Sequence, residues 1–535
     1  MLGSKMLRWV SSVCVLSLSL PAYGQQPNIK LDAIIAPLSK PDSPGCAVAA
    51  EQSGQRIATH AFGLADLEHS VLNKHDTVFE AGSVSKQFTA AATLLLVEEG
   101  KLKLDDDIRK YLPEMPDYGT PVSIDHLMYH TSGLRDWGVV AGVTGWPRGT
   151  RAYTNDDALR IAVAQRSLNY PPGSEYSYTN TGYNLLAVIV ERVTGQSLAA
   201  YTKARLFEPL GMKNTSWRDD FQRVVSNRAV PYRLAGSGRY EEDRPFENDY
   251  GNGGLLTTVG DLMIWNAALT AGKLGPSVTA QLQDRATLSS GQRITYARGL
   301  VVNEYKGAAT VSHSGTTGGY RAWLERFPES SLSIAVLCNS SNINPGEIAR
   351  QFADTALDLQ DVPAKAIFVK GLAANTGMYV NVSTGATLWL DMAGSTIKLR
   401  GGPVLTPVGG GRFQSAAGQF VFNSADSFTL TDNSGQPMRF ERTAPVTLDA
   451  SLDRYVGTFA NAEASGVRYA VTAGTAGTLT LQLLDRSDPK FAPPIILKPT
   501  YKNAFEDGNG ITVRFEPGAM VLGMPRLRAL RFVRE

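Results

Sequence analysis

The sequence predicts an α/β domain with an antiparallel sheet flanked by helices and a helical subdomain, followed by two small antiparallel β barrels. An early strand hairpin and a late run of strands enclose a long helical region, which is typical of one sheet assembled from both ends of a segment. After Pro363 the helical patterns stop, and short alternating strands continue to the end. We therefore expect domains at 25–360, 372–447 and 448–535, with a linker at 361–371.

Composition limits the kind of partner. The formal net charge is +2 over 535 residues, which does not favour a nucleic acid or an anionic membrane as a partner. No internal stretch is long and apolar enough to cross a bilayer, so we expect no membrane span in the mature form. The oligomeric state is left open.

The N-terminal segment 1–24 is predicted to be a signal peptide. Lys5 and Arg8 precede an apolar run at 9–20, and small residues follow before Gln25. A buried helix or an uncleaved anchor are the alternatives. The pattern favours export, and we expect a secreted or periplasmic protein.

Cleavage there would remove Cys14 and leave Cys46 and Cys338. Both lie in apolar, strand-like runs, so two buried free thiols are favoured, while one disulfide stays possible in an oxidising compartment. Neither cysteine has the local spacing of a metal site. No metal or cofactor is expected.

The expected elements of the first domain follow from periodicity and from residues that begin or end helices. A hairpin is predicted from strands at 45–50 and 56–63, and the late strands at 299–305, 309–315, 320–327 and 332–338. Helices are predicted from the Ser83 segment to Gly100, at 185–193, after the capping residue Thr258, and from the capping residue Asn344 to about 359.

The C-terminal part contains an internal repeat. The first copy runs from Gly377 to Arg442 and the second from Gly457 to Arg534, with similar residues at both ends. Each copy is a string of short strands, which predicts two small barrels or sandwiches. One larger barrel is the alternative.

Ser83 and Lys86 are three positions apart at the start of an apolar, alanine-rich helix. Positions i and i+3 share a helix face, so the lysine can lie beside the serine. A serine hydroxyl is a poor nucleophile until a base takes its proton, and a desolvated lysine can be that base. An ordinary helix start, with the lysine facing water, is the alternative for this pair taken alone.

Two further motifs follow in order. Tyr178-Thr179-Asn180 lies in a turn-rich loop before a helix, and His313-Ser314-Gly315 lies on a late strand. His126 and His130 have the i, i+4 spacing of some zinc motifs, but the glutamate of those motifs is absent, so both are interpreted as structural.

With these three motifs in order, residues 40–355 resemble the penicillin-recognising serine hydrolases, which include class C β-lactamases, DD-peptidases, D-aminopeptidases and esterases. The resemblance implies a β-lactamase/DD-peptidase-like fold and an acyl-enzyme on Ser83. Lys86 and Tyr178 would share the proton transfers, and either could be the base. Asn180 would bind the substrate amide or hold Lys86. The backbone N–H groups of Ser83 and Thr316 would form the oxyanion hole.

His313 and the C-terminal repeat indicate which members of this family the chain resembles more. His313 lies where many relatives have lysine, so β-lactamase activity is less expected, and His313 would serve as a donor or proton relay beside the substrate-binding Gly315. Two C-terminal β domains are similar to the three-domain D-aminopeptidases. There a loop of the last domain helps to select a free substrate amine. Here that loop is predicted at 485–490, with Asp485 or Asp488 binding the ammonium; a solvated surface loop is the alternative.

The resemblance therefore implies a small peptide, amide or ester substrate, and we expect an exported serine hydrolase of D-amino-acid-containing peptides or amides. A DD-carboxypeptidase or esterase of the same fold is the alternative enzyme, and an inactive binding scaffold is the non-enzyme alternative.

Overall fold

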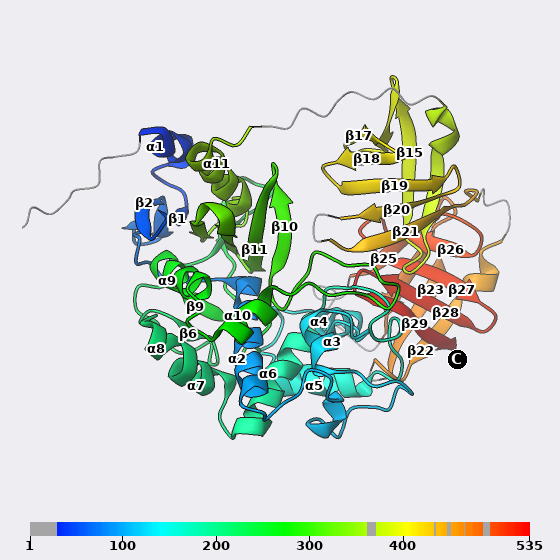
Figure 1. Cartoon of the computed structure of the whole chain (residues 1–535). Helices are drawn as coiled ribbons and strands as arrows, with labels where there is room; N and C mark the ends of the chain where they lie inside the picture. Colours follow the sequence, from blue (N-terminus) through cyan, green and yellow to red (C-terminus); the bar gives the residue numbers. More distant parts are fainter. Residues whose placement is uncertain (1–28, 361–370, 433–434, 447–450, 465, 485–492) are drawn as a thin grey trace, which may run out of the picture.

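The computed structural model describes residues 29–360, 371–432, 435–446, 451–464, 466–484 and 493–535. A six-stranded antiparallel sheet forms the centre of the first domain (Figure 1). Its order is β10 (Val301–Tyr305), β11 (Ala308–Thr317), β12 (Tyr320–Phe327), β13 (Leu332–Cys338), β1 (Cys46–Gln52) and β2 (Gln55–Phe62). The predicted hairpin and the predicted late strands thus meet in one sheet, as expected.

β1 and β13 join the two ends of this domain. They pair antiparallel from Cys46 opposite Cys338 to Gln52 opposite Leu332. The two cysteines form a disulfide, so the preference for two free thiols was wrong. Their spacing of 292 residues along the chain gives no local sign of this pairing, which only the strand register produces.

Alternate residues of β1 pack on opposite faces of the sheet. Cys46, Val48 and Ala50 join one cluster with α1 (Ile29–Ile35) and α11 (Pro345–Leu357). Ala47 and Ala49 join the larger cluster on the other face, which includes α2 (Lys86–Glu98) and α9 (Val259–Thr270). Every second side chain points to the same face of a strand, so one apolar strand serves both layers.

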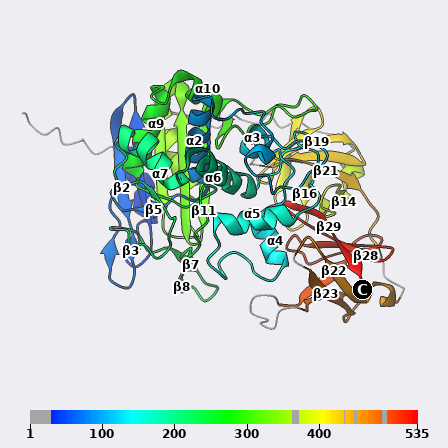
Figure 2. The same cartoon turned by 90° about the horizontal axis from the view of Figure 1, so that it is seen from below.

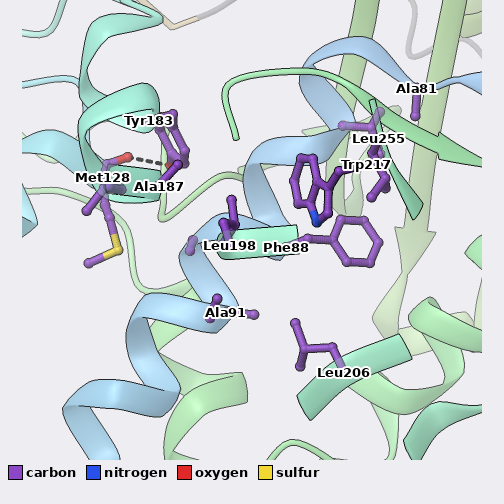
Figure 3. Packing of buried hydrophobic residues seen from close by; sticks show 14 of the residues in the cluster. Ala81, Phe88, Ala91, Met128, Tyr183, Ala187, Leu198, Leu206, Trp217 and Leu255 are labelled. Atoms are coloured by element: carbon purple, nitrogen blue, oxygen red, sulfur yellow. Dashed lines mark hydrogen bonds between the residues drawn. The ribbon is translucent and has the colours of Figure 1, made fainter. Parts of the chain in front are cut away.

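The helical subdomain surrounds α2. Its other helices are α3 (Ile124–Met128), α4 (Trp137–Val143), α5 (Asn155–Ala164), α6 (Thr181–Thr194), α7 (Leu198–Thr202), α8 (Glu208–Leu210) and α10 (Pro276–Gln283). Figure 3 shows Phe88 in this core among Ala91, Leu206 and Trp217. The centre of the Phe88 ring also lies 5.9 Å from that of Phe207 and 4.2 Å from that of Trp265. In the same core the Tyr183 hydroxyl donates to the carbonyl of Met128 at 2.8 Å, which joins α6 to α3.

Short strands complete this domain. They are β3 (Leu64–Asp66), β4 (Val71–Leu72), β5 (Phe79–Glu80), β6 (Ser216–Trp217), β7 (Tyr232–Leu234), β8 (Tyr240–Glu242) and β9 (Leu255–Thr257). β5, β9 and β6 form a three-stranded sheet that leads directly into the Ser83 turn.

The C-terminal part forms two closed antiparallel barrels, so the alternative of one larger barrel was wrong. The first contains β14 (Gly377–Asn381), β15 (Thr387–Ala393), β16 (Thr396–Leu399), β17 (Val404–Gly409), β18 (Arg412–Ser415), β19 (Gly418–Ser424), β20 (Ser427–Thr431) and β21 (Pro437–Arg442). The second contains β22 (Gly457–Asn461), β23 (Val467–Ala473), β24 (Leu479–Leu483), β25 (Ile495–Pro499), β26 (Ala504–Glu506), β27 (Thr512–Glu516), β28 (Ala519–Met524) and β29 (Leu527–Arg534).

The second barrel packs against the helical subdomain beside α4 and α5 (Figure 2). Val140 and Val143 of α4 belong to the same buried cluster as the barrel interior, and the Tyr469 hydroxyl donates to the Val143 carbonyl at 2.7 Å. Arg135, almost fully buried, forms an ion pair of 2.7 Å with Glu463 of the barrel. The second barrel therefore shares a buried interface with the first domain.

Several predictions fall on residues outside the described ranges. These are the signal peptide at 1–24, nearly all of the linker at 361–371, and the loop with Asp485 and Asp488. The domain boundaries stay predictions. Within the described ranges, no helix combines the length and hydropathy needed to cross a bilayer.

Candidate functional site

Ser83 lies in a tight turn wedged against the sheet. Residues Gly82–Ser85 form a 3₁₀ turn that continues into α2 at Lys86. Gly82 has a φ of +50°, and a methyl group there would lie 2.6 Å from the backbone nitrogen of Thr316. Only glycine allows this approach, so the Ser83 turn and strand β11 come into direct contact.

Gly315, on strand β11, also allows close contact between this strand and the Ser83 turn. A methyl group on Gly315 would lie 2.0 Å from the carbonyl oxygen of Ala81. The glycine of the third motif therefore lets β11 close onto the residues before Ser83. This brings Thr316 beside the nucleophile turn, where the proposed pair of oxyanion donors would need to be.

Lys86 is fully buried behind Ser83. Its Nζ donates to Asn180 Oδ1 at 3.0 Å and to the Asn252 carbonyl at 2.6 Å, and it lies 3.2 Å from Ser83 Oγ. Burial holds the pKa of Lys86 well below its usual value, and the nearby Arg526 charge adds to this effect. Asn180 is thus in direct contact with Lys86, as one of the two roles considered for it requires. The Asn252 carbonyl was not foreseen, since any residue type offers a carbonyl.

Tyr178 lies beside this pair. The Nζ of Lys86 is 4.8 Å from the centre of the Tyr178 ring, and the buried Tyr178 hydroxyl lies beside the Ser83 hydroxyl. Burial raises the pKa of Tyr178 above its usual value, although the neighbouring Ser83 hydroxyl and the Arg526 charge oppose this shift. The structure therefore combines a lysine biased toward its neutral form with a phenol biased toward its protonated form.

His130 supports the Tyr178 ring. Its ring centre lies 4.2 Å from that of Tyr178, and its Nδ1 accepts a hydrogen bond of 3.3 Å from the Thr179 backbone. Its φ of +58° is unusual for a residue other than glycine. His126 instead completes the N-terminal cap of α3 by accepting from the backbone of Ser123. The cap contact of His126 agrees with the structural interpretation, whereas the contact of His130 with the site was missed.

Asp136 holds the loop of the second motif. Its carboxylate accepts hydrogen bonds of 2.8 Å from the Asn180 backbone and of 3.0 Å from Gly138 at the start of α4. Sequence analysis missed this residue. An aspartate before a helix is a cap signal, and that signal could have identified it.

His313 lies on β11 at the edge of the site. Its Nδ1 is 2.6 Å from the Ser314 carbonyl and its Nε2 is 3.1 Å from the Tyr296 hydroxyl. A carbonyl only accepts, so Nδ1 carries the proton and Nε2 accepts from Tyr296. Burial, reinforced by the nearby Lys86 charge, lowers the pKa of His313 to about 4. The side chain is therefore neutral near pH 7 and supplies no fixed positive charge.

Of these groups, Ser83, Tyr178 and His313 border a cleft of about 840 Å³ between the three domains. The first domain contributes Ser83, Glu175, Tyr178, His313 and Thr316 to its walls; the first barrel contributes Asn381, Ser383, Thr384, Asp432, Met438 and Arg439; the second barrel contributes Pro525, Arg526 and Arg528. The walls thus include residues from both barrels, which motif analysis did not identify.

The turn between β28 and β29 carries Arg526 into the site. Its guanidinium carbon lies 4.9 Å from the centre of the Tyr178 ring. The last domain was predicted to reach the site through the loop with Asp485 and Asp488, which lies outside the described residues. The contact that the structure describes is made by the turn between β28 and β29, and the side chain that makes it is the cation Arg526.

Residues 31–357 of this chain match the model of the Beta-lactamase family. The D-aminopeptidase of Gluconobacter oxydans is 29% identical over 382 residues, which are 70% of each chain. Penicillin-binding protein 4* of Bacillus subtilis is 30% identical over 366 residues, covering 62% of this chain and 77% of that protein.

Solved structures show the same fold. The octameric penicillin-binding protein homologue from Pyrococcus abyssi has a TM-score of 0.55 and 23% identity, covering 85% of this chain and 98% of its own. The D-amino acid amidase from Ochrobactrum anthropi SV3, complexed with D-phenylalanine, has a TM-score of 0.53 and 20% identity, covering 62% and 99%.

Proposed function

The chain is a serine hydrolase of the beta-lactamase family, and we propose that it cleaves peptides or amides containing D-amino acids through an acyl-enzyme on Ser83. The observation that carries the proposal is the 3.2 Å contact between the Nζ of the buried Lys86 and the Ser83 hydroxyl, in the wall of an 840 Å³ cleft. The names of the similar D-aminopeptidases and D-amino acid amidase support the choice of substrate.

Lys86 is the proposed base. Burial lowers its pKa, so a neutral amine is available to accept the Ser83 proton as the hydroxyl oxygen attacks the substrate carbonyl. The backbone N–H groups of Ser83 and Thr316 would stabilise the negative charge that develops on the carbonyl oxygen. Asn180 and the Asn252 carbonyl keep the amine directed at Ser83.

Tyr178 is the proposed proton donor to the leaving group. Its raised pKa keeps the phenol protonated near pH 7. When the tetrahedral intermediate collapses, the carbonyl–nitrogen bond breaks, the leaving nitrogen takes the Tyr178 proton, and the proton held on Lys86 replaces it. Water then attacks the acyl-enzyme with the same groups, which releases the acid and restores the Ser83 hydroxyl.

Export is part of the proposal. The charged and apolar pattern of residues 1–24 predicts a signal peptide. The disulfide between Cys46 and Cys338 is in keeping with an oxidising compartment such as the periplasm or the cell exterior.

The test is labelling with a fluorophosphonate, followed by intact-mass measurement and peptide mapping. We expect one adduct on Ser83 in the wild type and none in Ser83→Ala. Hydrolysis of D-alanine p-nitroanilide should exceed that of the L-enantiomer, and Ser83→Ala should abolish it. Equal labelling of both proteins would refute the assignment of the nucleophile, and equal turnover of both enantiomers would refute the D-preference.

A further inference from the structure

Glu80 is a buried carboxylate three positions before Ser83, in the strand β5 that leads into the Ser83 turn. Its oxygens accept hydrogen bonds from two arginines. Arg218 donates from Nε at 3.1 Å and from a terminal nitrogen at 3.4 Å, and Arg228 donates at 3.3 Å. Both arginine side chains are themselves almost fully buried. A carboxylate held by two planar donor groups in this way has little freedom to move.

The Glu80 carboxylate also contacts strand β11. Thr317 Oγ1 donates a hydrogen bond of 3.4 Å to Glu80 Oε1. Thr317 directly follows Thr316, whose backbone N–H is one of the two proposed oxyanion donors. Among the described residues that line the cleft, Thr316 is present and Thr317 is not, so the Thr317 side chain faces Glu80 and not the substrate.

This side-chain contact joins two segments that lie close together without pairing. Gly82 and Gly315 allow the close approach and set the smallest distance between the segments. In the described part of the chain, no backbone hydrogen bond joins residues 80–83 to residues 314–317, because β5 pairs with β9, and β11 pairs with β10 and β12. The hydrogen bond from Thr317 therefore supplies a directional attraction between them.

A second connection runs through Arg228. Its Nε donates to the Tyr320 hydroxyl at 3.2 Å, and Tyr320 lies opposite Thr317 in the pairing of β11 with β12. The Tyr320 hydroxyl in turn donates to the Ala229 carbonyl. The Glu80 carboxylate is thus connected to both strands at this end of the hairpin.

We propose that Glu80 is a positioning residue for the oxyanion hole. Through Thr317 it fixes the distance between the backbone N–H groups of Ser83 and Thr316. This inference rests on the proposed function, because these groups act only when a substrate carbonyl oxygen becomes negatively charged. An oxyanion hole lowers the barrier only if its donors are in place before the reaction, since moving them during the reaction costs free energy.

The experiment uses two esters that differ in one atom. The p-nitrophenyl ester of acetyl-D-alanine and its thiono analogue, in which sulfur replaces the carbonyl oxygen, are assayed with the full chain. Each kcat/KM is divided by the rate constant of the same ester with hydroxide. Sulfur is a weak hydrogen-bond acceptor, so the oxo-over-thiono ratio measures how well the two donors fit an oxyanion. We expect a wild-type ratio of about 100 or more, the effect of one such donor.

Thr317→Val keeps the shape of the side chain and removes its hydroxyl. We expect it to lower the oxo-over-thiono ratio about tenfold, because the Thr316 donor is displaced rather than lost. Thr317→Ser keeps the hydroxyl and should retain most of the ratio.

Thr215→Val is the matched control. Thr215 Oγ1 donates at 2.7 Å to the buried carboxylate of Asp261 in the same domain, so this variant removes the same kind of hydrogen bond away from the cleft. It should lower the Tm at least as much as Thr317→Val, because its hydrogen bond is shorter, and it should leave the oxo-over-thiono ratio unchanged. A purely structural role of Thr317 predicts the wild-type ratio in both variants.

An unchanged ratio in Thr317→Val, with Ser83 still labelled, would overturn the inference and leave the proposed function intact. A wild-type ratio near one, or an equal loss in Thr215→Val, would overturn it as well. On a Glu80→Gln background, Thr317→Val should change the ratio less than about twofold, and full additivity would show that the hydroxyl does not act through Glu80. If Glu80→Gln does not fold, the comparison with Thr215→Val decides alone. Absence of Ser83 labelling or of ester turnover in the wild type would refute the proposed function, and the inference with it.

Discussion

The backbone N–H of Asp136 donates a hydrogen bond of 3.2 Å to the carbonyl oxygen of Arg526. The carboxylate of the same aspartate holds the backbone of Asn180. One residue thus connects the turn of the second barrel to the loop that carries Tyr178. The position of the barrel and the geometry of the site are therefore coupled, and the predictions below test this coupling and its electrostatic consequences.

Removing the positive charge of Arg526 and removing the negative charge of Asp136 should shift the acidic limb of the pH–rate profile in opposite directions. The Arg526 charge lowers the pKa of Lys86 and the Asp136 charge raises it. If neutral Lys86 is the base, kcat/KM rises with pH through this pKa. Arg526→Gln should shift the limb to higher pH, and Asp136→Asn should shift it to lower pH. The measurement is kcat/KM for an uncharged ester across pH, with Arg514→Gln as the control. Shifts in the same direction, or none, would argue that another group is the base.

His313 should stay neutral across the physiological range. Burial lowers its pKa to about 4, whereas the unfolded chain has a histidine pKa near 6.5. Between these values the unfolded state binds more protons, so the free energy of unfolding falls as the pH drops from about 6.5 to 4, by on the order of 3 kcal/mol. His313→Gln should reduce this dependence. Exposed His69, whose pKa is raised by Asp66, supplies the control variant His69→Gln, which should not.

Nuclear magnetic resonance checks the same point directly. The His313 ring signal, assigned by its loss in His313→Gln, should not titrate between pH 5.5 and 8. A midpoint near 6.5 would contradict the buried, doubly hydrogen-bonded imidazole.

The ion pair between Arg135 and Glu463 should stabilise the position of the second barrel. The Arg135 side chain is only 2% exposed, so Glu463→Ala leaves a buried charge without its partner. We expect a loss of about 2–4 kcal/mol in the free energy of unfolding and slower labelling of Ser83, because Arg135 adjoins Asp136. Glu516→Ala removes an exposed partner of Arg514 in the same barrel and should cost less than about 1 kcal/mol. Equal effects of the two variants in thermal unfolding would contradict this role.

The disulfide should contribute to stability by constraining the unfolded chain. Cys46 and Cys338 are separated by 292 residues, and Cys46→Ala/Cys338→Ala should lower the free energy of unfolding by about 2–5 kcal/mol. A chain that begins at Gln25, and so lacks Cys14, should contain no titratable thiol when unfolded without reductant, and two after reduction. Two thiols before reduction would show that the pair is not formed.

Local sequence patterns were sufficient to predict the main helices and strands and the order of the three motifs. The helix after Ser83, the capped starts at Thr258 and Asn344, and the strands of the sheet follow from periodicities of a few residues. Such signals are short-range, so they survive without knowledge of the fold. The repeat likewise predicted two barrels, because each copy carries its own strands.

The sequence by itself thus determined the family, the three motifs and the architecture. Only the tertiary structure decided which groups meet at Ser83: the Asn252 carbonyl on Lys86, His130 against Tyr178, and Arg526 from the second barrel. Arg526 lies 348 positions beyond Tyr178, the difference of their residue numbers, and no periodicity spans such a distance. Contacts of this kind arise from the packing of whole domains, which is why no local pattern identified the turn with Arg526 at the cleft. The loop that was predicted there, at 485–490, stays a prediction.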